Sequence, residues 1–251
     1  MTIRALTFDY WDTLYEGLAQ PERVSFRRAA LRRMLDDLGC PIDEGEFVEL
    51  YRASGEEAER WWREEHRGYT AEERIRWMLR QLSIERPQDC EHVRRAVQAV
   101  DDGLLMLPPR LLDGAAESLG RLSAEFELGI ISDTGFASGR AQDRLLEKDG
   151  LRPLFRVTIY SAEVGHAKPR REPFEAAIAS FGVEPSQIIH IGDNERTDVR
   201  GALTAGMRAV RVDFVKQSGP SSAEFVARTF DELRDYLFEQ AVPPAPLSAQ
   251  A

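Results

Sequence analysis

The segment IRALTFDYWDTL, residues 3–14, decides the fold. Residues 3–8 are almost continuously apolar, which is typical of a parallel strand buried on both faces. Asp9 follows directly, at the carboxyl end of this strand. Because open α/β sheets bind their ligands beyond the carboxyl ends of the strands, we expect the carboxylate of Asp9 to face a ligand crevice. The segment therefore predicts both the architecture and the place of the chemistry.

Four further apolar runs complete the predicted sheet, at residues 128–131, 157–160, 188–191 and 209–212. Helical periodicity fills the gaps between them after Leu111. Strands that alternate with helices favour a parallel sheet with right-handed crossovers. The sequence thus predicts an α/β fold with a doubly wound, Rossmann-like parallel core of five strands.

Residues 15–110 contain helical patterns only, and we expect them to form an inserted four-helix cap. Four amphipathic stripes mark its helices, and they begin near Val24, Phe47, Ile75 and Val93. A capping box from Thr70 to Glu73 precedes the third stripe. The predicted division is residues 1–14 and 111–240 for the core, 15–110 for the cap, and 241–251 for a disordered tail rich in Pro, Ala and Ser.

The composition and charge argue against several kinds of partner. With 43% hydrophobic residues among 251, the chain can bury a full core. A net charge of -10 repels phosphate backbones, so no nucleic-acid partner is expected. The two cysteines form no metal or disulfide pattern, and neither a leader pattern nor a membrane-length apolar run is found. We therefore expect a cytoplasmic protein without a membrane partner; its oligomeric state is not predicted.

Asp9 is the first candidate catalytic residue. Its carboxylate can attack phosphorus or carbon and form a covalent aspartyl intermediate, which divides one difficult displacement into two easier ones. The alternative is a strand-end aspartate that only caps a turn.

The next two strand ends carry groups that could assist Asp9. The hydroxyl of Ser132 could hold a phosphoryl oxygen, although Ser132 alone is more often a turn residue, and Asp133 and Thr134 more often cap the following helix. Lys168 is one of three lysines in an arginine-dominated chain and could place a compact positive charge against phosphate and Asp9; a solvated lysine is the alternative. Ser132, Asp133 and Lys168 are the predicted substrate-binding residues.

A pair of acids after the fourth strand predicts a magnesium site. Asp193 and Asp198 offer hard oxygen ligands of the kind that Mg²⁺ prefers. Asp193 is the stronger candidate for a direct ligand, because Asp198 could instead support the ligands or cap the next helix. His190 alternates into the sheet and is interpreted as a packed histidine.

These four blocks, with a helical insert after the first, resemble the haloacid dehalogenase (HAD)-like hydrolase superfamily, in its members with a helical C1-type cap. The resemblance covers the chain except its tail. It implies that Asp9 is the nucleophile, Ser132 the phosphate-binding hydroxyl and Lys168 a stabilising cation. It also implies Mg²⁺ held by Asp9, the backbone carbonyl of Trp11, and Asp193; Asp198 is a further candidate ligand.

The sequence departs from this family at Trp11. Phosphatases of the family usually have a second aspartate there, which protonates the leaving group and later activates water. Asp12 is one position further on, and strand alternation would turn it away from the Asp9 side. General acid–base catalysis contributes roughly 10² to 10⁴ in rate, so aryl and acyl phosphates should suffer least from its loss. Glu65 or His66 of the cap could substitute.

Three functions remain open at this level. The first is a Mg²⁺-dependent phosphatase acting on a small phosphorylated metabolite. The second is a 2-haloacid dehalogenase, which needs no leaving-group proton and, by the resemblance, also has an aromatic residue at the position of Trp11. The third is a binding protein that has lost efficient catalysis. Carbon–phosphorus cleavage is set aside, because the resemblance implies a cap lysine and none occurs between Tyr15 and Arg110.

The cap has several large aromatic side chains, at Trp61, Trp62, Tyr69 and Trp77. They could line an apolar pocket for the leaving group, or they could fill the core of the cap. The identity of the substrate is not predicted.

Overall fold

A six-stranded parallel sheet forms the centre of the molecule in the computed structural model, which describes residues 2–17, 20–86 and 90–241. The strand order is β3-β2-β1-β4-β5-β6. The strands are β1 (Ala5–Phe8), β2 (Glu127–Ser132), β3 (Phe155–Tyr160), β4 (Ile188–Gly192), β5 (Arg208–Val212) and β6 (Phe225–Ala227). The predicted doubly wound α/β core is confirmed, with one strand more than the five expected.

The sixth strand, β6, was missed because it is short and only partly buried. It has three residues, and Phe225 and Val226 keep part of their surface exposed. A strand of this length at the edge of a sheet carries too few apolar positions to form a recognisable run.

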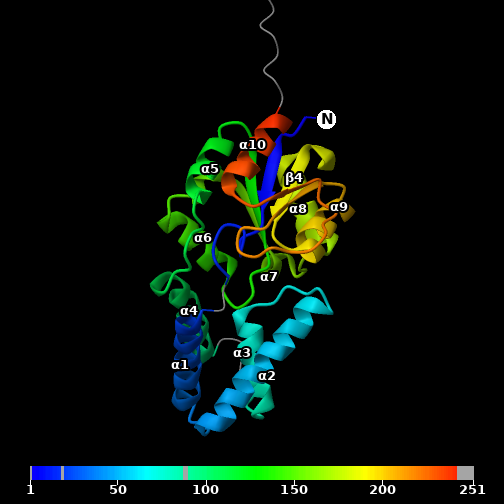
Figure 1. Ribbon diagram of the computed structural model, residues 1–251. Helices are drawn as coiled ribbons and strands as arrows, with labels where there is room; N and C mark the ends of the chain where they lie inside the picture. Colours follow the sequence, from blue (N-terminus) through cyan, green and yellow to red (C-terminus); the bar gives the residue numbers. More distant parts are fainter. Residues whose placement is uncertain (1, 18–19, 87–89, 242–251) are drawn as a thin grey trace, which may run out of the picture.

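Helices cover both faces of the sheet. Alternate residues of β1 point to opposite faces, so that Leu6 and Phe8 pack on one side and Ala5 on the other. The first side is covered by α5 (Ala115–Leu122), α6 (Gly139–Lys148) and α10 (Phe230–Gln240). The second side is covered by α8 (Arg171–Phe181) and α9 (Arg200–Thr204), as Figure 1 shows. Short helical turns lie at η1 (Arg152–Leu154), α7 (Ser161–Val164), η2 (Pro185–Gln187) and η3 (Glu195–Val199).

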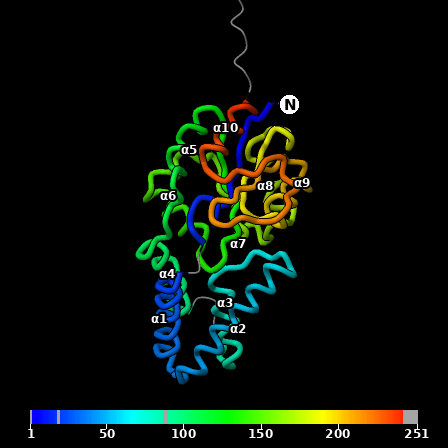
Figure 2. Tube along the Cα trace, in the orientation of Figure 1, coloured from blue at the N-terminus to red at the C-terminus, as the bar shows by residue number. Residues whose placement is uncertain are grey.

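Four helices lie between β1 and α5, as predicted, and we call residues 21–106 the helical insert. They are α1 (Pro21–Asp37), α2 (Glu44–Arg63), α3 (Ala71–Gln81) and α4 (Glu91–Met106). The capping box of Thr70 and Glu73 is present at the start of α3. The insert has its own apolar cluster, which Phe136 of the core joins, and it lies beside one end of the sheet (Figures 1 and 2). The domain boundaries given above stay a prediction.

The two chain segments that enter and leave the insert are joined to each other. Tyr15 and Leu111 form an antiparallel bridge, and the amide of Glu16 donates to the carbonyl of Arg110 at 3.0 Å. The buried guanidinium of Arg23 donates to the carbonyls of Gly17 and Leu107 at 3.0 and 3.1 Å. The insert is therefore held at its base by a pair of linkers that must bend together.

No helix within the described ranges is both long and apolar enough to span a membrane. The predicted disordered tail, apart from Ala241, lies outside the described residues.

Candidate active site

Asp9 lies where three central strands end. β1 pairs with β2 on one side and with β4 on the other, and Phe8 is in register with both Ile130 and Ile191. The amide of Asp9 donates to the carbonyl of Ile191 at 2.8 Å. This register brings the residues that follow β2 and β4 next to Asp9, as the sequence predicted.

Lys168 makes the closest contacts of the site. It comes from the loop before α8, and its side chain is 2% exposed. Its ammonium group donates to Oδ1 of Asp9 at 2.5 Å and to Oδ1 of Asp198 at 2.6 Å. A third hydrogen bond, 3.0 Å long, reaches the carbonyl of Ile131. All three ammonium protons are therefore used within the protein, and the alternative of a solvated lysine is wrong.

The charges in this cluster shift one another's pKa values. Burial acts against the charged form of Lys168, but Asp198, Asp9 and Asp133 outweigh it and raise the pKa of Lys168. Burial likewise opposes ionisation of Asp198, yet Lys168 and His190 hold its pKa below the usual value. Burial raises the pKa of Asp9, and Lys168 acts against that rise. The ionised, nucleophilic form of Asp9 therefore depends on cations beside it.

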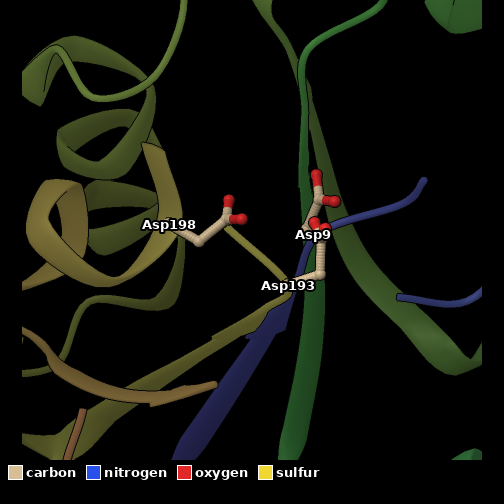
Figure 3. A group of neighbouring side chains, drawn as sticks. All are labelled: Asp9, Asp193 and Asp198. Carbon is tan, nitrogen blue, oxygen red and sulfur yellow. The ribbon is translucent and has the colours of Figure 1, made fainter. Parts of the chain in front are cut away.

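Asp9, Asp193 and Asp198 form a group in which one carboxylate oxygen of each lies within 4.8 Å of the others (Figure 3). Asp193 accepts no hydrogen bond from any residue that the structure describes. Burial, then the charges of Asp198 and Asp12, raise the pKa of Asp193 to about 7. Hard oxygen ligands in such number suit Mg²⁺, so the donor set fits this ion.

Asp198 is already engaged on both of its carboxylate oxygens. Oδ1 accepts from Lys168, and Oδ2 accepts from the amide of Asn194 at 2.9 Å. His190, which is fully buried as predicted, lies 3.3 Å from Oδ1. The alternative that Asp198 caps the following helix is wrong, because the side chain of Asn194 caps η3. Asp193 is thus freer to bind a cation than Asp198, and Oδ2 of Asp9 accepts only a long hydrogen bond, 3.5 Å, from the hydroxyl of Thr13.

Ser132 and Asp133 lie side by side in the chain but in different surroundings. The hydroxyl of Ser132 is buried and donates to Oε1 of Gln142 at 2.8 Å, and Ser132 is not among the residues that line the cavity beside Asp9. Asp133 does line that cavity and accepts from the amide of Lys168 at 3.1 Å. The alternative that Asp133 or Thr134 caps the following helix is wrong, because the N-cap of α6 is Ser138. The phosphate-binding role of Ser132 stays a prediction.

The cavity beside Asp9 has a volume of about 370 Å³ and lies between the sheet and the helical insert. The sheet side contributes, among others, Asp9, Trp11, Asp12, Asp133, Lys168, Asp193, Asp198 and Lys216. The insert contributes Glu59, Trp62, Arg63, Arg67 and Tyr69. The volume suits a small metabolite.

The aromatic residues of the insert divide between the two roles considered for them. Trp62 and Tyr69 line the cavity, and the indole N–H of Trp62 donates to Asp133 at 2.8 Å. Trp61 is buried against Tyr69, and Trp77 packs on the core of the insert. The sequence could not separate these roles, because all four positions lie on or beside helices that pack together.

Asp12 lies in the same cavity as Asp9, which corrects the expectation that it turns away. The strand ends at Phe8, and Asp12 has a φ of 57°, so strand alternation does not extend to this residue. Its Oδ1 accepts from the amide of Gly17 at 2.8 Å. Asp12 therefore contacts the linker into the insert as well as the cavity.

Glu65 and His66, the cap residues considered as substitutes for the missing aspartate, do not line the cavity. Glu65 forms an ion pair with Arg60, and the ring of His66 is turned to the carbonyl of Trp62 at 3.4 Å. The acids that do line the insert side and the linker side are Glu59 and Asp12.

Backbone contacts fix the insert against the loop that carries Lys168. The amide of Gly68 donates to the carbonyl of Gly165 at 3.2 Å, and the amide of Ala167 donates to the carbonyl of His66 at 2.9 Å. A Cβ at Gly68 would lie 1.8 Å from the carbonyl oxygen of Ser161. Figure 2 shows this segment, after α2, passing beside α7. The insert thus closes one side of the cavity.

An α/β sheet with a buried aspartate–lysine pair and a cluster of acids at the strand ends is typical of a hydrolase that uses an aspartate. The chain belongs to the haloacid dehalogenase-like hydrolases, whose family model matches residues 3–206. The predicted family membership is confirmed, and with it the assignment of the protein as a hydrolase.

Several relatives that are named as phosphatases match most of the chain. A glyceraldehyde 3-phosphate phosphatase of Methanopyrus kandleri is 29% identical over 212 residues, which are 84% of each chain. A ribulose-1,5-bisphosphate 5-phosphatase of Halopiger xanaduensis is 27% identical over 232 residues, which are 90% of this chain and 91% of the relative.

Solved structures confirm the fold. A HAD phosphatase from Thermococcus onnurineus superposes with a TM-score of 0.69 at 22% identity, covering 96% of this chain and all of that one (100%). A 2-haloacid dehalogenase from Pseudomonas syringae also gives a TM-score of 0.69, at 23% identity, covering 95% and 100%. Because both activities occur on this fold, the fold does not decide between them.

Proposed function

We propose that the protein is a Mg²⁺-dependent phosphatase that hydrolyses a small phosphorylated metabolite through an aspartyl-phosphate intermediate at Asp9. The observation that carries the proposal is the group of Asp9, Asp193 and Asp198, in which three carboxylate oxygens crowd within 4.8 Å. Lys168 is bonded to two of these acids and leaves Asp193 without a partner among the described residues. A divalent cation would balance this charge before an anionic substrate enters.

The phosphatase names of the relatives from Methanopyrus and Halopiger support the same reaction. The 2-haloacid dehalogenase is the second candidate, supported by Trp11 and by the solved structure from Pseudomonas. The acidic group disfavours it, because uncompensated carboxylates repel the carboxylate of a haloacid. A catalytically impaired binding protein is the third candidate.

In the proposed mechanism, an oxygen of Asp9 attacks phosphorus and the ester oxygen of the substrate departs with the leaving group. Water then attacks the aspartyl phosphate, which releases inorganic phosphate and restores Asp9. Lys168 holds Asp9 in place and favours its ionised form, and Asp198 in turn holds Lys168. Mg²⁺, bound by Asp9, Asp193 and the backbone carbonyl of Trp11, would screen the negative charge of the phosphoryl group. Ser132 would position a phosphoryl oxygen.

The direct test is phosphate release from a panel of phosphorylated metabolites, measured with Mg²⁺ and with a chelator. The proposal expects turnover that requires Mg²⁺ and is lost in Asp9→Asn. Release of halide from 2-chloropropionate without phosphate release would establish the dehalogenase instead. Turnover that survives either the chelator or the substitution would reject the mechanism.

A further inference from the structure

The two walls of the cavity carry opposite charge. The sheet side presents five acids and two lysines, so the acids are in excess: Asp9, Asp12, Asp133, Asp193 and Asp198 against Lys168 and Lys216. The insert side presents Arg63, Arg67 and the hydroxyl-bearing Tyr69, with Glu59 as its acid. Glu59 is paired with Arg63, so it is neutralised on its own helix. A small substrate in this cavity therefore lies between an acidic sheet side and an insert side whose side chains can donate hydrogen bonds.

The side chains on the insert side do not bind the phosphoryl group that is transferred. That group must lie against Asp9, on the sheet side of the cavity, where Lys168 and the proposed cation lie. The part of the substrate that remains is the leaving group, and it is the part that can extend across the cavity to the insert. The side chains on the insert side of the cavity therefore indicate which chemical groups the leaving group carries.

Arg67 is the best positioned hydrogen-bond donor on the insert side of the cavity. Its backbone forms an antiparallel bridge with His166, which ties it to the core. Its guanidinium lies 4.7 Å above the ring of Trp61, and one of its nitrogens pairs with Glu73. A guanidinium has five N–H donors in a fixed planar arrangement, so others remain for a ligand. The side chain is 34% exposed, and it lines the cavity.

Tyr69 adds a second donor two residues further on. It lines the cavity, and its hydroxyl makes no hydrogen bond to any residue in the described part of the chain. Its ring is held by an edge-on contact with Trp61, with ring centres 5.6 Å apart. Arg67 and Tyr69 both contact the ring of Trp61 and both line the cavity, and a guanidinium and an unused hydroxyl are donors that suit the oxygens of a phosphate or a carboxylate.

We propose that the insert recognises a second anionic group on the leaving group of the substrate, a phosphate or a carboxylate, through Arg67 with Tyr69. The substrate class is then a bisphosphate or a phosphorylated acid. This inference rests on the proposed phosphatase function. It deepens that function by assigning the insert side of the cavity to the leaving group.

The test compares three substrates with one carbon skeleton: glycerol 3-phosphate, 3-phosphoglycerate and glycerol 1,3-bisphosphate. The first has no second anionic group, and the other two distinguish a carboxylate from a phosphate. We expect kcat/KM for at least one of the two substrates with a second anionic group to exceed that for glycerol 3-phosphate by about tenfold or more, since hydrogen bonds to charged groups are the strong ones.

Arg67→Ala should remove most of this preference, and Arg67→Lys should retain part of it. Arg52→Ala is the matched control, because Arg52 lies on α2, pairs with Glu49 and Glu56, and does not line the cavity. The ratio of kcat/KM between substrates is the readout, since a loss of folded protein lowers all three values equally.

The outcomes separate the two proposals. If none of these or other phosphates is hydrolysed, the proposed function fails. If glycerol 3-phosphate is hydrolysed as efficiently as the other two, the function stands and the second anionic group is wrong. If the preference for a second anionic group persists unchanged in Arg67→Ala, the insert side does not recognise that group through Arg67.

Discussion

Lys168 contributes to stability and to chemistry through the same three hydrogen bonds. Its ammonium group joins Asp9 after β1, Asp198 in η3 and the carbonyl of Ile131 in β2. These groups are almost completely buried. A buried charge that loses its partner is far more costly than an exposed one, because no water replaces the lost contact.

Lys168→Met should therefore destabilise the protein as well as inactivate it. We expect the free energy of unfolding to fall by about 3–5 kcal/mol, since two buried carboxylates lose their cation. Lys148→Met is the control, because Lys148 is exposed and makes only a 3.5 Å contact with the carbonyl of Leu105. Urea unfolding of both variants checks this, and equal midpoints would contradict the structural role of Lys168.

The pKa of Asp193, about 7 in the metal-free site, predicts a pH-dependent stability. The folded form binds the proton of Asp193 more tightly than the unfolded form, whose pKa is the ordinary 3.8. Ionisation of Asp193 therefore costs stability; this cost is fully present above the folded pKa of about 7 and disappears as the pH falls from there to the unfolded pKa of 3.8. Unfolding in chelator at several pH values should show the trend in the native protein and a weaker one in Asp193→Asn. Identical pH profiles would show that Asp193 is not responsible.

The rate of phosphate hydrolysis should depend strongly on the leaving group, because the indole of Trp11 cannot protonate a departing alkoxide. Aryl and acyl phosphates should be hydrolysed faster than alkyl phosphates. Trp11→Asp should raise the ratio of alkyl to aryl turnover by about 10-fold or more, which is within the range for general acid catalysis. Steady-state rates on p-nitrophenyl phosphate and glycerol 3-phosphate check this. An unchanged ratio would mean that another group already supplies the proton.

Sequence reasoning identified the candidate site where a residue's position follows from the end of a strand. Asp9 and Asp193 were found in this way, Lys168 was found as a scarce lysine in the loop before a helix, and the structure brings the three together. It could not foresee that Ser132 is engaged by Gln142, which approaches from α6. Nor could it foresee the left-handed conformation of Asp12, because aspartate adopts this conformation only occasionally and nothing in the sequence marks this position for it.

At the scale of elements, the segment between α2 and α3 has the most consequence for function. It places Arg67 in the cavity and binds the loop before Lys168 through two backbone hydrogen bonds. Its side-chain orientations could not be predicted, because helical periodicity identifies buried stripes but not how the insert docks on the core. The strands were predicted better, since buried apolar runs need no knowledge of docking.

Gly68 is the residue at which this docking can be tested. A methyl group there would meet Ser161 and Ala162 of α7, so Gly68→Ala should force the insert away from the core and lower kcat/KM. Gly120→Ala in α5 is the control, because a Cβ at Gly120 meets nothing within 4 Å and alanine favours a helix by about 1 kcal/mol. Steady-state kinetics and thermal unfolding of both variants check the prediction. Unaltered kinetics in Gly68→Ala would show that this contact does not shape the active site.

For the whole molecule, the strand order explains why one site draws on distant parts of the chain. β1 lies between β2 and β4, so the residues after these strands meet at one edge of the sheet. The insert leaves the core just after β1 and returns before α5, through paired linkers, which places its helices over that same edge (Figure 1). In the proposed function, the sheet thereby carries the chemistry and the insert recognises the substrate.

The covalent intermediate is the most direct test of this account. The protein is mixed with Mg²⁺ and an acyl or aryl phosphate that it hydrolyses, quenched in acid during turnover, digested and analysed by mass spectrometry. The account predicts one phosphoryl group on the peptide that contains Asp9, absent from Asp9→Asn and lost when the quench is delayed until the substrate is consumed. Rapid phosphate release with no phosphorylated Asp9 at any time of quenching would contradict it.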